Sequence, residues 1–135
     1  MDGRMVEETA CVAFPVDAST PALARRAGEL FQRDAGIACD GLDLVISELV
    51  TNAVRHATRT VEMTLHHAGD GLTVEVRDDS PDAPTGRDAA DSDHAGRGLA
   101  IVQAIAGSWS VAWHADGTKM VSARLRCTPL RPPVG

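Results

Sequence analysis

Hydrophobic residues recur along the chain with two different spacings, and these spacings predict the elements of the fold. Alternation of apolar and polar residues, which is typical of a strand with one buried face, runs through five segments: 5–16, 60–67, 71–78, 109–114 and 119–127. Apolar residues three and four apart, which are typical of an amphipathic helix, mark three more: 20–34, 41–57, and a segment from 96 or 98 to 106.

Residues between these segments predict where the helices and the tight turns lie. Ser19 is expected to cap the first helix, with Pro21 in its first turn, and Gly36 to end it. Asp40 is expected to cap the second helix. The run Ala-Gly-Asp-Gly at 68–71 predicts a hairpin turn between two strands.

The predicted order is β-α-α-β-β-loop-α-β-β, without the regular alternation of a parallel α/β sheet. It favours an α+β fold, a two-layer sandwich in which helices pack on one face of a mixed, mostly antiparallel sheet. We expect one domain over 1–135 with its core at about 5–127, followed by a loose tail at 128–135 that holds three prolines.

Composition and charge exclude several classes of function. The chain has 135 residues, of which 44% are hydrophobic and 24% charged, as in an ordinary soluble domain. A net charge of -6 argues against a nonspecific nucleic-acid binder, which needs a basic face. The acidic start does not resemble a signal peptide, and no apolar run has membrane-spanning length. We therefore expect a cytoplasmic protein that binds neither membranes nor nucleic acids.

The cysteines are odd in number and far apart in sequence, at positions Cys11, Cys39 and Cys127. They form no C-x-x-C pair and no disulfide framework. The sequence therefore predicts three reduced thiols.

Two further pairs of residues are interpreted as structural. His66 and His67 suggest a metal site, but neighbours on a strand point to opposite faces and no third ligand accompanies them. Trp109 and Trp113 are four apart on a predicted strand, so they share a face, and we expect them to pack against the fold.

The helix at 41–57 carries the first candidate for chemistry. Glu48 and Asn52 are four residues apart, so their side chains can reach the same ligand. A carboxylate accepts a proton and an amide oxygen binds a hard cation such as magnesium. The alternative is a solvated polar stripe on an amphipathic helix.

Two later segments add a carboxylate and an anion-binding turn. Asp78 lies where a strand ends, and its carboxylate can accept a hydrogen bond from an exocyclic amine; the alternative is a plain turn. After the long polar loop 79–95, the run Gly96-Arg97-Gly98-Leu99 opens a helix. Glycines let backbone N–H groups approach phosphate, although a flexible junction would have the same composition.

Together these motifs resemble the histidine-kinase-like ATPase superfamily, and within it the bacterial anti-sigma-factor serine kinases. The similarity runs from about residue 5 to residue 126, and its most specific element is Ser-Glu-Leu-Val-Thr-Asn-Ala at 47–53. The resemblance implies ATP and Mg²⁺ as cofactors. It implies that Glu48 is the catalytic carboxylate, that Asn52 is the magnesium ligand and that Asp78 receives the adenine amino group.

The resemblance also assigns the phosphate end of the nucleotide. Gly96 and Gly98, with Arg97 and Leu99, match a second glycine box whose amides contact phosphates, and 79–95 would be the mobile lid. Arg97 could meet the terminal phosphate, although an arginine between two glycines is as often exposed to solvent.

The chain departs from the family in two places. The first glycine box, D-x-G-x-G, is here Asp-Asp-Ser-Pro-Asp at 78–82 and lacks both glycines. The usual Gly-Lys-Thr before the last strand becomes Thr118-Lys119-Met120, which leads us to expect Met120 in the threonine's place near the base. Thr118 remains a candidate site residue.

The resemblance implies a protein serine/threonine kinase that regulates transcription by partner switching. Such a kinase holds a sigma factor, phosphorylates an anti-anti-sigma (STAS-like) protein and forms a homodimer. Two alternatives stay open: an ATP-binding switch module without phosphoryl transfer, and an interaction domain that binds no nucleotide.

Overall fold

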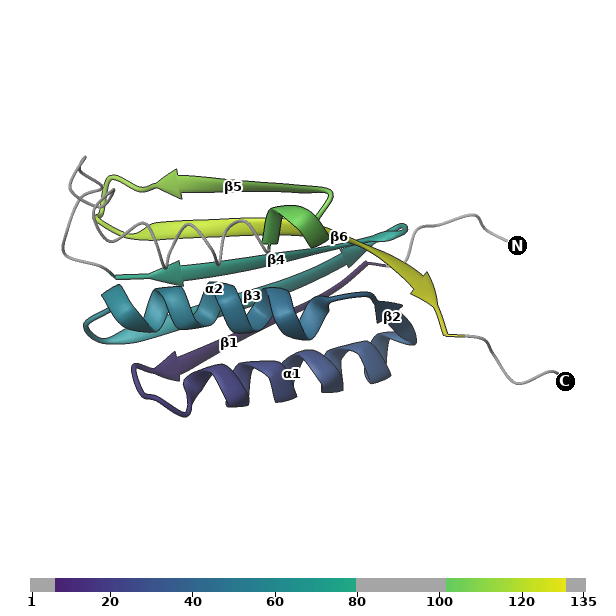
Figure 1. Ribbon diagram of the computed structural model, residues 1–135, viewed down its shortest axis with the longest axis horizontal. Helices are drawn as coiled ribbons and strands as arrows, with labels where there is room; N and C mark the ends of the chain where they lie inside the picture. The colour runs from purple at the N-terminus through teal and green to yellow at the C-terminus, as the bar shows by residue number, and fades with distance from the viewer. Residues whose placement is uncertain (1–6, 80–101, 131–135) are drawn as a thin grey trace, which may run out of the picture.

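An antiparallel sheet forms one layer of the structure and two helices on one of its faces form the other (Figure 1). The computed structural model describes residues 7–79 and 102–130. Within them the elements follow in the order β1 (Glu7–Pro15), α1 (Thr20–Ala35), β2 (Ile37–Cys39), α2 (Leu42–His56), β3 (Thr60–Ala68), β4 (Gly71–Asp78), β5 (Ser108–Trp113) and β6 (Lys119–Pro129). The α+β sandwich expected from the sequence is confirmed.

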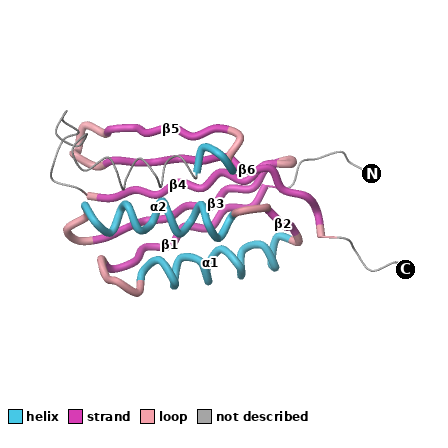
Figure 2. Tube along the Cα trace, in the orientation of Figure 1, coloured by secondary structure: helices cyan, strands magenta, loops and turns pink. Residues whose placement is uncertain are grey.

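The described strands form a six-stranded sheet in the order β1-β3-β4-β6-β2, with β5 also paired to β6. Every pairing between them is antiparallel. β6 pairs with β5 through residues 119–124 and with β2 through residues 127–129. Figure 2 shows both helices on the same face of this sheet.

Two of these features differ from the prediction. β2 was missed, because three residues are too few for an alternating pattern to be visible. β6 ends at Pro129, so Thr128 and Pro129, which were expected in a loose tail, pair with Ala38 and Ile37. The hairpin at residues 68–71 is confirmed, with Gly69 in the left-handed region at φ 62°.

The core lies between the helices and the face of the sheet that they cover. Alternate residues of β3, β4 and β6 point into it, and α2 supplies the aliphatic stripe Leu42, Val45, Ile46, Leu49, Val50 and Ala53. Burying one such aliphatic side chain stabilises the fold by about 1.5–3 kcal/mol. Ala57, which was expected in the helix at 41–57, is the half-buried residue that follows the end of α2 at His56.

The helix ends differ from the predicted caps. The Ser19 hydroxyl donates to the Asp17 carboxylate instead of accepting from the helix, and the Thr20 hydroxyl donates to the Pro15 carbonyl at 2.5 Å. Gly36 ends α1, as predicted, and its backbone lies in the left-handed region.

At the start of α2, Gly41 is the N-cap in place of Asp40. Its φ is 81°, and a Cβ atom there would lie 2.4 Å from Ile105 Cγ2, so only glycine satisfies both constraints. Ile105 belongs to the helical turn at residues 102–105, which therefore packs against the beginning of α2.

The histidine and tryptophan pairs lie as the strand period predicts. His67 is buried, whereas the ring of His66, on the opposite face, lies 2.6 Å (Nδ1) from the Thr9 hydroxyl. Trp109 and Trp113 pair with Ala123 and Lys119, so both lie on the helix-covered face. Trp109 packs against the core, but Trp113 is 48% exposed. Among the described helices, none combines the length and the apolarity that crossing a membrane requires.

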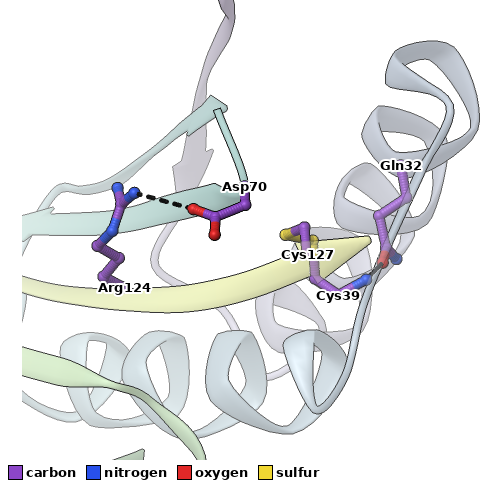
Figure 3. Close-up of a disulfide and its surroundings, with 5 residues drawn as sticks. All are labelled: Gln32, Cys39, Asp70, Arg124 and Cys127. Carbon is purple, nitrogen blue, oxygen red and sulfur yellow. Dashed lines mark hydrogen bonds and ion pairs between the residues drawn. A yellow bond between two sulfur atoms is a disulfide. The ribbon is translucent and has the colours of Figure 1, made fainter. Parts of the chain in front are cut away.

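A disulfide joins Cys39 of β2 to Cys127 of β6, which corrects the expectation of three reduced thiols (Figure 3). The two residues are 88 positions apart in sequence but directly opposite each other in the sheet. The Cys39 N–H donates to Gln32 Oε1 at 2.8 Å, and the Cys127 N–H donates to the Asp70 carbonyl at 2.8 Å. Cys11 is a free, exposed thiol.

Reduction of the Cys39–Cys127 disulfide should lower the free energy of unfolding by about 2–5 kcal/mol, because the bond restricts a long loop of the unfolded chain. Urea unfolding with and without dithiothreitol measures the difference. A Cys39→Ser/Cys127→Ser double variant should lose the response to dithiothreitol, and Cys11→Ser should keep it. Titration of three free thiols in the denatured, unreduced protein would instead support the reduced state.

Candidate functional site

A row of paired residues crosses the helix-covered face of the sheet at the end where β4 finishes. From β1 to β5 its members are Phe14, Val61, Asp78, Lys119 and Trp113, each directly opposite the next. Phe14 and Val61 are apolar and buried, as a core position requires. The next two positions carry charges, and the last carries an exposed aromatic ring. The row therefore changes from core to a polar site between β3 and β4.

Asp78 and Lys119 form a buried ion pair in this row. The Lys119 ammonium lies 3.4 Å from Asp78 Oδ2, and the two residues are only 9% and 2% exposed. On its other side, Lys119 Nζ lies 5.8 Å from the centre of the Trp113 ring, within range of a cation–π interaction. Removing one partner of a buried pair typically costs about 3–5 kcal/mol, because the other charge is left uncompensated. A hydrogen-bond acceptor, the Asp78 carboxylate, and a donor, the Lys119 ammonium, thus lie side by side on neighbouring strands.

The position opposite Asp78 corrects the prediction for Met120. Met120 pairs with Arg77 and lies on the other face of the sheet, so Lys119 is the β6 residue next to the Asp78 carboxylate. The sequence alone could have indicated this position. Val121, Ala123 and Leu125 alternate with outward residues and point inward, and the same two-residue period places Lys119 on the inward face. A lysine at an inward position was not expected, since lysines are rarely buried unless paired.

Asp79 holds the loop after α2 against the end of β4. Its carboxylate accepts from the Thr58 N–H at 3.0 Å, the Thr58 hydroxyl at 3.1 Å and the Arg59 N–H at 3.2 Å. Burial raises the pKa of Asp79, but the hydrogen bonds from Thr58 and Arg59 outweigh it and leave the pKa below its usual value. These bonds tie the C-terminal end of α2 to the strand end that carries Asp78.

Glu48 and Asn52 lie on the border of α2 that faces away from α1. The opposite border is marked by Ser47, whose hydroxyl accepts a hydrogen bond from Arg25 of α1 at 2.9 Å. α1 contacts β1 and β3, whereas α2 contacts β3, β4 and β6. α2 thus lies between α1 and the β6 side of the sheet (Figure 1). The Glu48–Asn52 border, which faces away from α1, therefore faces the β6 side. Both side chains are half-buried, and Arg55 is exposed one turn later. A ligand over β4 and β6 would lie beside this border.

The remaining predicted site residues fall into two groups. Gly96, Arg97, Gly98 and Leu99 lie outside the described residues, as does the expected lid apart from Asp79. Thr118 is described, and its N–H and hydroxyl donate to Asp116 Oδ1 at 3.0 Å and 2.7 Å. These bonds hold Thr118 in the turn before β6, and they lower the pKa of Asp116.

Comparison with known proteins identifies the family. The model of the histidine kinase-like ATPase domain matches residues 14–125, which is most of the chain. The chain belongs to the histidine kinase-like ATPase family. The superfamily inferred from the motifs at 47–53, 78 and 96–99 is thereby confirmed.

The structural comparison agrees with the family at the level of the fold. Among solved structures, the histidine kinase AdeS of Acinetobacter baumannii matches with a TM-score of 0.54 and 15% sequence identity, over 87% of this chain and 67% of that chain. No curated protein sequence is significantly similar to this ATPase domain. At such low identity the similarity to AdeS establishes the shared fold alone.

Replacing Asp79 by alanine should destabilise the ATPase domain in a pH-dependent way. A carboxyl whose pKa is lowered by folding stabilises the native state above its unfolded pKa of about 4, and this stabilisation is lost as the pH falls through the folded pKa. The gap between wild type and Asp79→Ala in urea unfolding should therefore be full at neutral pH and shrink below about pH 4. Asp34→Ala, which removes an exposed carboxylate from α1, serves as the control. An equal gap at neutral and acidic pH would show that the Asp79 charge is not what holds the loop.

Proposed function

We propose that this histidine kinase-like ATPase domain binds Mg-ATP and transfers the γ-phosphate to a serine or threonine of a partner protein. The observation that carries the proposal is the buried Asp78 carboxylate, at the end of β4 and on the same side of the fold as the Glu48–Asn52 border. A buried carboxylate at a sheet end can recognise an amine of a base, and the border of α2 offers the oxygen atoms that magnesium prefers.

The residues present fit an adenine nucleotide. Asp78 accepts hydrogen bonds and Lys119 donates them, so the pair complements a base edge that carries both kinds of group. Burial strengthens such hydrogen bonds, because water competes for them less than at the surface. Trp113 adds an exposed aromatic surface at the end of the same row.

Glu48 and Asn52 have separate roles in this proposal. Asn52 would hold the magnesium ion through its amide oxygen, and the ion would offset phosphate charge during transfer. Glu48, one turn earlier on the same border, would orient or deprotonate the hydroxyl of the acceptor. Both side chains are half-buried, which excludes bulk water in part and leaves access for a ligand.

The proposed partners follow from the resemblance to anti-sigma-factor kinases. The chain would hold a sigma factor, phosphorylate an anti-anti-sigma protein of the STAS-like class and so regulate transcription by exchanging partners. A homodimer belongs to the same proposal. The sequence motif Ser-Glu-Leu-Val-Thr-Asn-Ala on α2 supports this branch of the family.

A second candidate function is an ATP-dependent binding module without phosphoryl transfer. The end of β4 favours it, because Asp79 follows Asp78 in a box that lacks both family glycines, and Asp79 is committed to holding Thr58 and Arg59. Because Asp79 is bonded to the loop after α2, a nucleotide bound at Asp78 would stabilise one conformation of the protein, which is what a binding module requires.

ATP with magnesium should raise the melting temperature, because a ligand that binds only the folded state stabilises it by about 2.7 kcal/mol at a hundredfold excess over its Kd. Asn52→Ala should remove most of the magnesium dependence and keep a response to the nucleotide. Thr51→Ala, the preceding residue of α2, is the matched control. A full magnesium response in Asn52→Ala would show that Asn52 is not the metal ligand.

Glu48→Ala separates the kinase from the binding module. Its ATP affinity should stay within a few-fold of wild type, whereas phosphoryl transfer should fall by about 10²–10⁴, the usual contribution of a positioned general base. Labelled ATP and partners first trapped on the ADP-bound and ATP-bound protein provide the assay. Glu75→Gln, on the opposite face of the sheet, should transfer at the wild-type rate. If wild type phosphorylates none of the trapped partners, the binding module is the correct function.

A further inference from the structure

We propose that Lys119 reads the nucleotide base together with Asp78, by donating a hydrogen bond to the ring nitrogen beside the adenine amino group. The inference rests on the proposed function, since it names a residue that determines base specificity at the same site. Its basis is the Asp78–Lys119 ion pair at 3.4 Å, on the helix-covered face of the sheet.

The register of the sheet places Lys119 where a base held by Asp78 must lie. Lys119 is directly opposite Asp78 in the β4–β6 pairing, and both side chains point toward the helices. A group that donates to Asp78 therefore has the Lys119 ammonium as its immediate neighbour. Val61, on the other side of Asp78, is apolar and fully buried and offers a base no polar contact.

The ammonium has more donors than its described partners use. It carries three N–H groups, and within residues 7–79 and 102–130 its charged or aromatic contacts are Asp78 and the ring of Trp113. At 9% exposure, hydration satisfies little of the remainder. A hydrogen-bond acceptor brought in by a ligand would compensate the ammonium, because desolvated charges need such partners.

Adenine brings an acceptor of this kind. Its amino group is a donor for Asp78, and it is flanked by two ring nitrogens, N1 and N7, which both accept hydrogen bonds. The adenine amino group can thus donate to Asp78 while the neighbouring ring nitrogen accepts from Lys119. Which of the two nitrogens faces Lys119 depends on the orientation of the base, and the experiment distinguishes them.

Calorimetric titration of ADP, 1-deaza-ADP and 7-deaza-ADP with magnesium tests the proposal. The three ligands share the same phosphates and sugar and differ by a single ring atom. Wild type should bind ADP about tenfold to a hundredfold more tightly than one of the two analogues, the usual effect of a lost charged hydrogen bond. In Lys119→Met, the affinities for ADP and for that analogue should agree within about twofold. The four affinities form a double-mutant cycle between the Lys119 ammonium and the ring nitrogen.

Two variants test the assignment to Lys119. Met120→Ala, the adjacent residue on the opposite face, should discriminate like wild type. If Lys119→Met does not fold, the neutral pair Asp78→Asn/Lys119→Met removes the uncompensated charge and should likewise lose the discrimination.

The outcomes separate this inference from the proposed function. Equal binding of all three ligands by wild type, or unchanged discrimination in Lys119→Met or in the neutral pair, would overturn the role of Lys119 and leave ATP binding intact. A wild-type protein that binds none of the three ligands would overturn the proposed function and this inference with it.

Discussion

The register between β4 and β6 is the constraint on which the site and much of the core depend. It pairs Asp78 with Lys119, and two residues further along it pairs Val76 with Val121. Because side chains alternate across a sheet, a slip of one residue would turn Lys119 and Val121 outward and bring Met120 to face Asp78. The apolar alternation of both strands opposes this slip, since it would expose the whole inward set. The hydrophobic core thus determines which charged residue accompanies the Asp78 carboxylate.

The candidate site is assembled from segments that the fold brings together. Asp78 comes from a central strand, Lys119 from the neighbouring strand, and Glu48 and Asn52 from a helix that lies over both. The Asp79 carboxylate connects the loop after α2 to the end of β4 through three hydrogen bonds. Asp79, which follows Asp78 directly in the chain, therefore acts as a structural link. This link connects the end of α2 to the strand end that carries the Asp78 carboxylate.

The shared fold limits what the family alone says about chemistry. AdeS has the same fold at 15% identity, and a fold supports many chemistries. The particular chemistry depends on individual side chains, and in this chain the Asp78–Lys119 ion pair lies at the candidate site. Each of its buried charges has to be compensated, so any ligand that bound there as proposed would have to compensate both of them.

Local patterns in the sequence determined most of the elements and their buried faces. The alternation in β3, β4 and β6 and the stripe of α2 were visible in the chain itself, because neighbouring residues decide which side of a strand or helix is apolar. The motif at 47–53 and the position of Asp78 at a strand end were likewise local, and they led to the family and to the side of α2 that carries Glu48 and Asn52.

Only the tertiary structure decided the contacts between distant segments. β2 is too short to show a period, and its pairing with β6 brings together Cys39 and Cys127, which lie 88 residues apart. The choice of Lys119 over Met120 required the register with β4, and the choice of Gly41 over Asp40 as a cap required the packing of Ile105. Each of these outcomes depends on a partner remote in the sequence. A local pattern specifies which face of a segment is buried, but the segment that packs against it is selected by the fold as a whole.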